Sequence, residues 1–145
     1  GSWLLYSAEL TGDKGRVVGI DLKPVSIKLP SHVETYIGDI FSLDEKLIEA
    51  IGKKFNVVMS DMAPSTTGNK HVDSARSFNL AMEALSIAGN ILISGGSFIC
   101  KIFQGEDFKK FSDEVKTNFL KYKIFKPQSS RKASREVYII GIEKK

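Results

Sequence analysis

The sequence is poor in the residues that support disulfide bonds or metal sites. Its 145 residues include one cysteine, Cys100, and two histidines. A single cysteine excludes a disulfide within the chain, and no Cys/His cluster has the spacing of metal ligands. We therefore expect no metal and a reducing, cytoplasmic compartment. Cys100 lies in an apolar run, which favours a packing role over a nucleophilic one.

Long hydrophobic runs are also missing. No apolar stretch approaches the roughly 20 residues that a membrane span needs. The N-terminus lacks a basic segment followed by an apolar one, the pattern of a signal peptide. A hydrophobic content of 42% and a charged content of 26% are typical of a globular protein without a membrane partner. The length predicts one domain over residues 1–145.

Positive charges exceed negative charges only slightly, which gives a formal net charge of +4. Its placement is more informative, because four basic residues gather around a Pro/Ser-rich stretch: Lys126, Arg131, Lys132 and Arg135. Such a cluster can contact phosphate groups. On charge alone, a solvated loop is an equally good interpretation.

Helical and strand patterns alternate along the chain. Helical spacing is found in 2–10, 43–51, 73–88 and 106–119, and strand patterns in 15–21, 33–37, 55–61, 98–103, 122–125 and 136–142. This order predicts an α/β fold, a mostly parallel, twisted, doubly wound sheet with helices on both faces and a hairpin-like, antiparallel finish. A Rossmann-like sheet begins with a strand, whereas this sequence begins with a helix. We therefore expect that the first strand is absent from this chain.

A lysine near the end of the apolar strand 98–103 is the strongest local signal of chemistry. An ammonium group is costly in a buried strand unless it has partners or faces a cleft, and clefts open at the carboxyl ends of parallel strands. Asp61 ends the strand expected beside Lys101, and Glu136 begins the last strand. Two carboxylates could fix the lysine in one orientation. From these residues alone, a structural ion pair is the favoured interpretation.

Three aspartates follow strand ends, at Asp21, Asp39 and Asp61. In a doubly wound sheet they would line one edge, where an acidic residue commonly accepts the ribose hydroxyls of a nucleoside cofactor. Asp39 suits an adenine edge, with Ile40 and Phe41 as apolar walls. Taken singly, each aspartate is more often a turn former or a helix cap. Their coincidence predicts a cofactor site.

Several long segments occur together in an order typical of one family. They closely resemble motifs of the FtsJ/RrmJ family, and they are 60–64 (SDMAP), 95–98 (GGSF), 101–106 (KIFQGE), 126–131 (KPQSSR) and 134–138 (SREVY). This resemblance covers essentially the whole chain. It implies an S-adenosylmethionine-dependent RNA ribose 2′-O-methyltransferase with a Rossmann-like fold. The most similar branch methylates a uridine of large-subunit ribosomal RNA.

The resemblance also implies roles for individual residues. The family's catalytic set is Lys-Asp-Lys-Glu, and its last three members match Asp61, Lys101 and Glu136. The first lysine and most of the glycine-rich cofactor motif belong to an N-terminal part that this sequence does not contain. Cofactor contacts are expected at Gly1, Trp3, Asp21, Asp39, Ile40 and Asp61. RNA contacts are expected at Lys126, Arg131, Lys132 and Arg135.

Two other function classes remain as alternatives. A nicotinamide-dependent oxidoreductase would also use Asp21 on a ribose, but it leaves Lys101 and its two acidic neighbours unexplained. A non-catalytic RNA-binding module of the same fold is the second alternative. Within the family, cap-directed, tRNA-directed and mitochondrial rRNA enzymes stay open, and the sequence predicts no oligomeric state.

Overall fold

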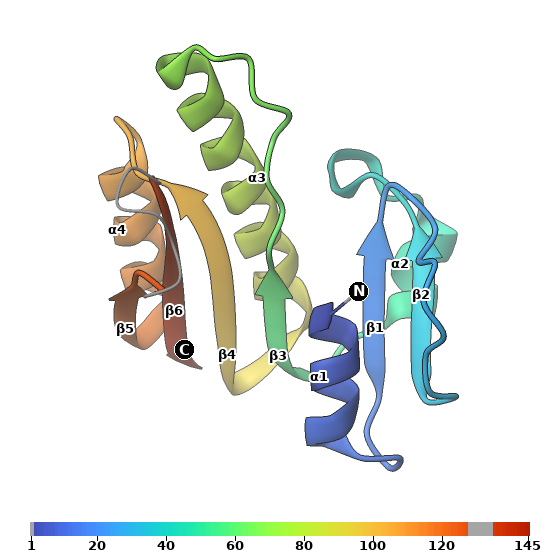
Figure 1. Cartoon of the computed structure of the whole chain (residues 1–145). Coiled ribbons are helices and arrows are strands. Elements are labelled where there is room, and N and C mark those ends of the chain that lie inside the picture. Colours follow the sequence, from blue (N-terminus) through green and yellow to red (C-terminus); the bar gives the residue numbers. More distant parts are fainter. Residues whose placement is uncertain (1, 128–134) are drawn as a thin grey trace. The chain divides into compact units, whose positions relative to one another are not determined.

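The structure is a computed structural model that describes residues 2–127 and 135–145 (Figure 1). The chain divides into two compact units, Gly1–Gly52 and Lys53–Lys145, which are called unit 1 and unit 2 below. Each unit is described by itself. The single domain expected from the length stays a prediction.

Unit 1 is built around two parallel strands. Its elements are α1 (Ser2–Thr11), β1 (Val17–Asp21), β2 (Val33–Ile37), a short 3-10 turn η1 (Ile40–Ser42) and α2 (Glu45–Ile51). The strands pair from Val17 opposite Val33 to Asp21 opposite Ile37. Helix α2 begins after Asp44, whose side chain accepts a hydrogen bond from the Leu47 amide at 2.7 Å. This N-cap satisfies an amide that has no partner within the helix.

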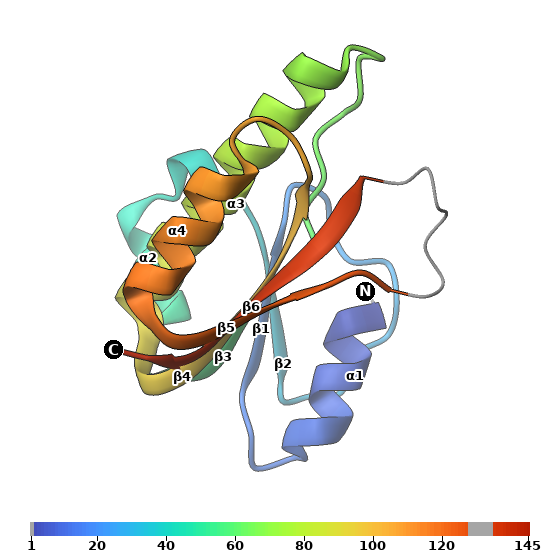
Figure 2. The ribbon, with the colours of Figure 1, turned by 90° about the vertical axis from the view of Figure 1, so that its left-hand side faces the viewer.

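The helices of unit 1 cover opposite faces of its sheet (Figure 2). A Cβ added at Gly19 would lie 2.7 Å from Cδ2 of Leu4 in α1, so β1 packs closely against that helix at this position. Ile20, the next residue of β1, faces the other way and lies near Gly38, which in turn contacts Leu47 of α2. Helices on both faces of the sheet are therefore present in this unit, as predicted.

Unit 2 holds a four-stranded sheet with the order β3-β4-β6-β5. Its elements are β3 (Phe55–Ser60), α3 (Lys70–Ile91), β4 (Leu92–Phe103), α4 (Phe108–Asn118), β5 (Phe119–Phe125) and β6 (Glu136–Lys144). Strands β3 and β4 are parallel, whereas β6 runs antiparallel to both β4 and β5. The predicted antiparallel last strand and hairpin-like finish are confirmed (Figure 1).

The predicted boundary between the third helix and the strand that follows it is wrong. The helix was expected to end at residue 88 and the strand to start at Phe98, but α3 continues through Gly89 to Ile91 and β4 starts at Leu92. Burial of Ala88 and Leu92, 0% and 6% exposed, outweighs the weak helix propensity of the intervening glycine. Gly95 does not stop the strand either. Its φ of +84° and the register shift against β3 mark an irregularity that glycine tolerates.

The core of unit 2 lies between one face of the sheet and helices α3 and α4. Alternate residues of β4, Phe98, Cys100 and Ile102, are at most 1% exposed and join a buried cluster with Leu85 of α3 and Phe111 of α4. Because side chains alternate along a strand, Ile99 and Lys101 point to the opposite face. That opposite face of the unit 2 sheet is called the site face below.

Candidate functional site

Lys101 and Asp61 meet at the end of two neighbouring parallel strands. Ser60 of β3 is paired with Cys100 of β4. The residues that follow them, Asp61 and Lys101, therefore lie side by side. The Lys101 Nζ atom is 3.4 Å from Asp61 Oδ1, and the two side chains are 13% and 42% exposed. The structure therefore brings together the lysine and the first of its two expected carboxylates.

Tyr138 is a member of this cluster that the sequence analysis missed. It is paired with Lys101 across β4 and β6, and its hydroxyl donates a hydrogen bond of 2.7 Å to Asp61 Oδ1. Burial, this hydrogen bond and the negative charges of Asp61 and Glu136 raise the pKa of the Tyr138 phenol. The signal was available, because Tyr138 follows Glu136 by two residues and must share its face of a strand.

Glu136 lies at the start of β6, half-buried and opposite Phe103. Its position two residues before Tyr138 places it on the site face, at the same end of the sheet as Lys101. Its negative charge acts on the Tyr138 phenol. A direct catalytic role for Glu136 stays a prediction.

A buried carboxylate shapes the loop that follows Asp61. Asp73, 4% exposed on the first turn of α3, accepts hydrogen bonds from the Thr67 amide at 2.8 Å and from the Thr67 hydroxyl at 2.9 Å. These bonds, with a further one from the Gly68 amide, lower the pKa of Asp73. The sequence predicted that the helix starts at Asp73 and did not predict these hydrogen bonds. Helix α3 begins at Lys70, with Asn69 as its N-cap.

Arg135 ties the start of α3 to the end of β4. Its guanidinium donates to Ser74 Oγ at 2.7 Å and to the Lys70 carbonyl at 3.3 Å, and it lies 5.6 Å from the centre of the Phe103 ring. Its own carbonyl accepts from the Gln104 amide at 2.8 Å. Arg135, Ser74 and Lys70 are among the residues that border a hollow of about 270 Å³. The described contacts are all within the fold, and an RNA contact of Arg135 stays a prediction.

The other predicted RNA-binding residues are only partly described. Lys126 follows β5 and is exposed. Arg131 and Lys132 lie outside the described residues. Their contact with RNA therefore stays a prediction.

Asp21 and Asp39 lie at adjoining strand ends in unit 1. The carbonyl of Asp21 accepts from the Gly38 amide at 2.9 Å, which holds the ends of β1 and β2 together. Both aspartates are exposed, and Ile40 is half-buried just after them. Among the other predicted cofactor residues, Trp3 is half-buried on α1, and Gly1 lies outside the described residues.

Each of these aspartates also has a local backbone role. Asp21 Oδ1 accepts from the Lys23 amide at 3.2 Å, and Asp39 Oδ1 accepts from the Phe41 amide at 3.0 Å. These are the turn and cap interactions that the sequence suggested as the alternative. Because an ionised carboxylate has several acceptor positions, both groups can also receive the hydroxyl or amino hydrogens of a nucleoside. The residues present therefore fit the predicted cofactor.

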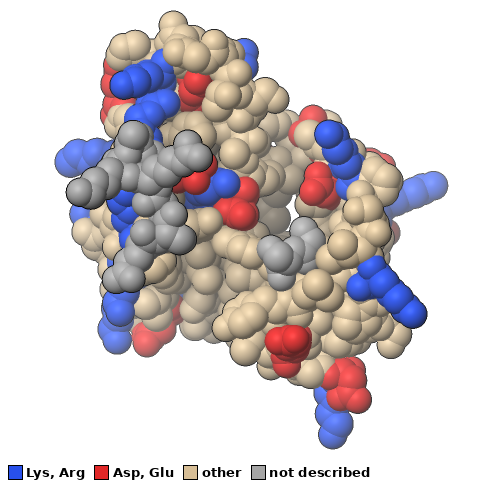
Figure 3. Space-filling view, viewed as in Figure 1, with Lys and Arg blue, Asp and Glu red and all other residues tan. Residues whose placement is uncertain are grey.

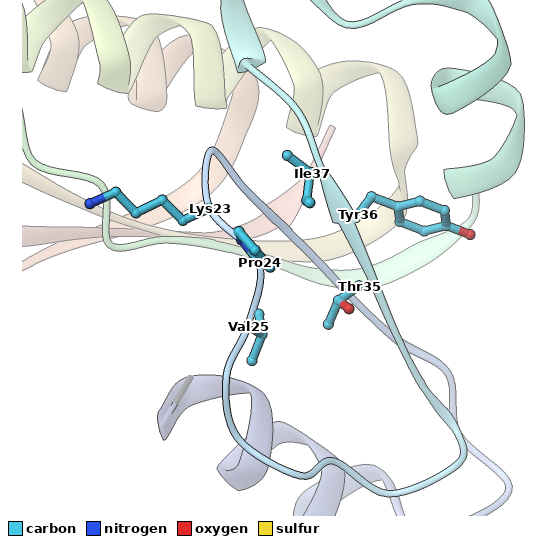
Figure 4. Close-up of a pocket in the computed structure, with 6 residues that line it drawn as sticks. All are labelled: Lys23, Pro24, Val25, Thr35, Tyr36 and Ile37. Atoms are coloured by element: carbon cyan, nitrogen blue, oxygen red, sulfur yellow. The ribbon is translucent and has the colours of Figure 1, made fainter.

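A small hollow in unit 1 lies beside β2 but not at these aspartates. Figure 4 shows its lining residues, Lys23 to Val25 from the loop after β1 and Thr35 to Ile37 from β2. Its volume is about 160 Å³, below the roughly 300 Å³ at which small-molecule pockets begin. The ammonium of Lys23 and the ring of Tyr36 point away from it (Figure 4). We assign it no ligand.

Other chemistry finds little support in the part of the chain that the structure describes. Cys100 is fully buried, and burial raises the pKa of its thiol to about 12, so the reactive thiolate is disfavoured. Within residues 2–127 and 135–145, no group of three or more His, Cys, Asp or Glu side chains could hold a metal ion. None of the described helices combines the length and apolar character needed to cross a membrane.

Comparison with known proteins decides the family. The FtsJ-like methyltransferase family matches residues 1–144. The chain belongs to the FtsJ-like methyltransferase family. A "Ribosomal RNA large subunit methyltransferase E" from Desulforapulum autotrophicum is 55% identical over 145 residues, which are 100% of this chain and 71% of that relative. A protein of the same name from Desulfatibacillum aliphaticivorans is 50% identical, over 100% of this chain and 70% of its own length.

Solved structures share the fold. A ribosomal RNA methyltransferase from Plasmodium falciparum superposes with a TM-score of 0.83 at 27% identity, over 99% of this chain and 81% of that one. An rRNA methylase from Clostridium thermocellum shares the fold, with a TM-score of 0.60 at 19% identity, over 97% of this chain and 81% of that one. The predicted family, the α/β methyltransferase fold and S-adenosylmethionine as methyl donor are confirmed. The FtsJ-like assignment also decides against the nicotinamide-dependent oxidoreductase.

Proposed function

We propose that this FtsJ-like protein methylates the 2′-hydroxyl of a ribose in large-subunit ribosomal RNA, at a uridine, with S-adenosylmethionine as donor. The names of the similar bacterial proteins support the RNA substrate. The observation that carries the chemistry is the Lys101 ammonium held 3.4 Å from Asp61 at the carboxyl end of β4. We also propose a cytoplasmic location, because bacterial ribosomes are assembled there.

Lys101 is proposed as the general base. Bound S-adenosylmethionine supplies a methyl group on a positively charged sulfur, which is already a good electrophile. A ribose hydroxyl is a poor nucleophile until its proton is accepted, and a positioned lysine can do this while it is neutral. Only 13% of the Lys101 side chain is exposed, so its Nζ atom is confined rather than sweeping through solvent.

Asp61 and Tyr138 are proposed to position that base. The Tyr138 hydroxyl and the Lys101 ammonium meet at the same oxygen, Asp61 Oδ1, at 2.7 Å and 3.4 Å. The shorter hydrogen bond fixes the carboxylate and takes up part of its acceptor capacity. Asp61 in turn keeps the Lys101 Nζ atom in one place. Glu136 is proposed to orient the ribose or Lys101.

Asp21 and Asp39 are proposed to hold the nucleoside part of the donor. A carboxylate can accept hydrogen bonds from two ribose hydroxyls at once, which suits Asp21 at the end of β1. Asp39, at the end of the next strand, suits the amino edge of adenine, with Ile40 as an apolar neighbour. Trp3, Gly1 and Asp61 complete the proposed set.

Transfer of a labelled methyl group tests the proposal. The protein is incubated with S-adenosylmethionine labelled on its methyl group and with unmodified large-subunit ribosomal RNA, and the RNA is then hydrolysed in alkali. A 2′-O-methyl group blocks cleavage at its own nucleotide, so we expect the label in an alkali-resistant dinucleotide that contains uridine. Label on a base, or in transfer RNA or capped RNA alone, would contradict the substrate. RNA binding without any transfer would indicate the non-catalytic module.

A further inference from the structure

The site face of unit 2 continues from Lys101 to the edge strand β5. Tyr138 pairs with Lys101 on one side and with Phe125 on the other, so these three residues form one row across β4, β6 and β5. Residues directly opposite in antiparallel strands point to the same face. Lys123 and Lys121 follow in the next rows, opposite Ile140 and Ile142. Phe125 and the two lysines therefore share the face of the proposed base.

The intervening residues of β5 point the other way. Tyr122 and Ile124 are paired with Gly141 and Ile139, and Ile139 is completely buried under the helices. Lys116 of α4 lies over the Tyr122 ring, with its Nζ atom 4.7 Å from the centroid. The alternation of β5 therefore separates a helix-facing side from a site-facing side, and the latter carries one aromatic and two basic residues.

The site-facing side of β5 has the composition of a surface that binds single-stranded nucleic acid. Phe125 is 53% exposed, which is unfavourable for a phenyl ring without a partner. Lys121 and Lys123 are exposed beside it, and Lys121 forms a weak ion pair of 3.9 Å with Glu143. Figure 3 shows basic side chains along this edge of unit 2. Aromatic rings that stack on bases, set among cations that contact phosphates, are how proteins hold unpaired RNA.

We propose that Phe125, Lys123 and Lys121, called the β5 platform, bind an unpaired nucleotide next to the methylated ribose. The base stacks on Phe125, and the adjoining phosphates contact the two lysines. Two strand spacings separate Phe125 from Lys101, about 10 Å, which one nucleotide can bridge. This inference rests on the proposed RNA substrate. It also predicts that the protein selects unpaired nucleotides, because a base paired in a duplex cannot stack on the Phe125 ring.

Equilibrium binding of three RNA probes tests the β5 platform. The probes are a single-stranded RNA of about 12 nucleotides, the same ribose-phosphate chain without bases, and the matching duplex. Phe125→Ala should weaken binding of the single strand roughly 10-fold, and leave the base-free chain and the duplex unchanged. Phe125→Trp should keep the affinity. The matched control is Ile124→Ala, since Ile124 is 48% exposed on the same strand but faces the helices.

Salt dependence tests the lysines separately. Lys123→Ala should weaken all single-stranded probes alike and reduce the slope of log affinity against log salt by about 0.7. Lys116→Ala, in helix α4 over the other face of β5, is the control. It should change neither the affinity nor the salt slope. Equal effects of Phe125→Ala and Ile124→Ala, or an equal loss for the base-free chain, would overturn the platform. Failure of methyl transfer with these binding results intact would contradict the proposed function instead.

Discussion

The two units differ in how much core supports their proposed site residues. In unit 2, thirteen buried side chains from both helices and from strands β4, β5 and β6 form one cluster behind Lys101, and partly buried residues of β3 pack against it. In unit 1, the buried hydrophobic side chains are Ala8, Val17 and Ile51, around a sheet of two strands. Two strands alone are marginally stable. The proposed base and its partners therefore lie on the unit with the larger core, which favours a fixed catalytic geometry. Asp21 and Asp39 lie on exposed strand ends.

The largest expected effect separates the two units by function. Lys101→Ala should lower the rate of methyl transfer by about two to four orders of magnitude, because a general base contributes that much. Binding of S-adenosylmethionine, proposed to depend mainly on residues of unit 1, should persist. Single-turnover transfer and calorimetric titration of the donor measure the two effects.

Asp21→Ala is the matched variant for that comparison. It should weaken donor binding and leave the transfer rate at saturating donor much less affected. A Lys101→Ala protein with a near-normal rate would remove the catalytic assignment, whatever happens at Asp21.

Removing a ring from the core should show the difference in stability. Phe98 is completely buried and stacks on Phe119 at 6.1 Å between ring centres. Phe98→Ala should cost about 3–5 kcal/mol of the free energy of unfolding. Urea denaturation measures this, with Ile124→Ala as the exposed control. Equal losses for the two variants would mean that the cluster is not the main source of stability in unit 2.

Loss of the Tyr138 hydroxyl should affect rate rather than stability. In Tyr138→Phe, Asp61 Oδ1 loses its hydrogen bond of 2.7 Å, so the Asp61 carboxylate and the Lys101 Nζ atom that it contacts are held less firmly. We expect a roughly 10-fold slower transfer, since about 1.4 kcal/mol corresponds to a factor of ten. A purely structural role would lower stability as well as rate, and Tyr122→Phe is the control.

A polar contact should matter more in unit 1, where the core is small. Arg16 donates to the carbonyls of Ile51 at 2.6 Å and Ala50 at 2.8 Å and pairs with Glu34 at 2.7 Å, so it joins the end of α2 to both strands. Arg16→Ala should cost about 1–2 kcal/mol, allowing for its partial exposure. Hydrogen exchange should then quicken in β1 and β2 first. Faster exchange in β4 instead would contradict the prediction that Arg16 stabilises mainly the strands of unit 1.

The smallest expected effect is pH-dependent and concerns the loop after Asp61. The pKa of Asp73 is lower in the folded state than in the unfolded chain, because Thr67 and Gly68 donate to its carboxylate. Its stabilising contribution is therefore complete above the ordinary aspartate pKa of about 3.9, and is lost as pH falls through the lower folded value. Asp73→Asn should be less stable than the unchanged protein at pH 7, and the two should converge in acid. Thermal melts across pH 2–7 measure this, and a constant difference would contradict it.

The sequence by itself determined the order of elements and the family, and it predicted that Lys101 and Asp61 lie together. Strands β1 and β2 are marked by short β-branched runs that stop at Asp21 and Gly38, and local signals of this kind need no tertiary context. Asp61, Lys101 and Glu136 were found because a charge at a buried strand end is costly and therefore informative.

Only the tertiary structure decided the partners across strands. The pairing of Lys101 with Tyr138 and of Tyr138 with Phe125 depends on the register of β4, β6 and β5, which no local pattern fixes. The same register decided which side of β5 faces the helices. The end of α3 beyond Gly89 was decided by burial of Ala88 and Leu92. In each case, long-range packing outweighed a weak local preference, because burying a large side chain contributes more free energy than one residue's propensity.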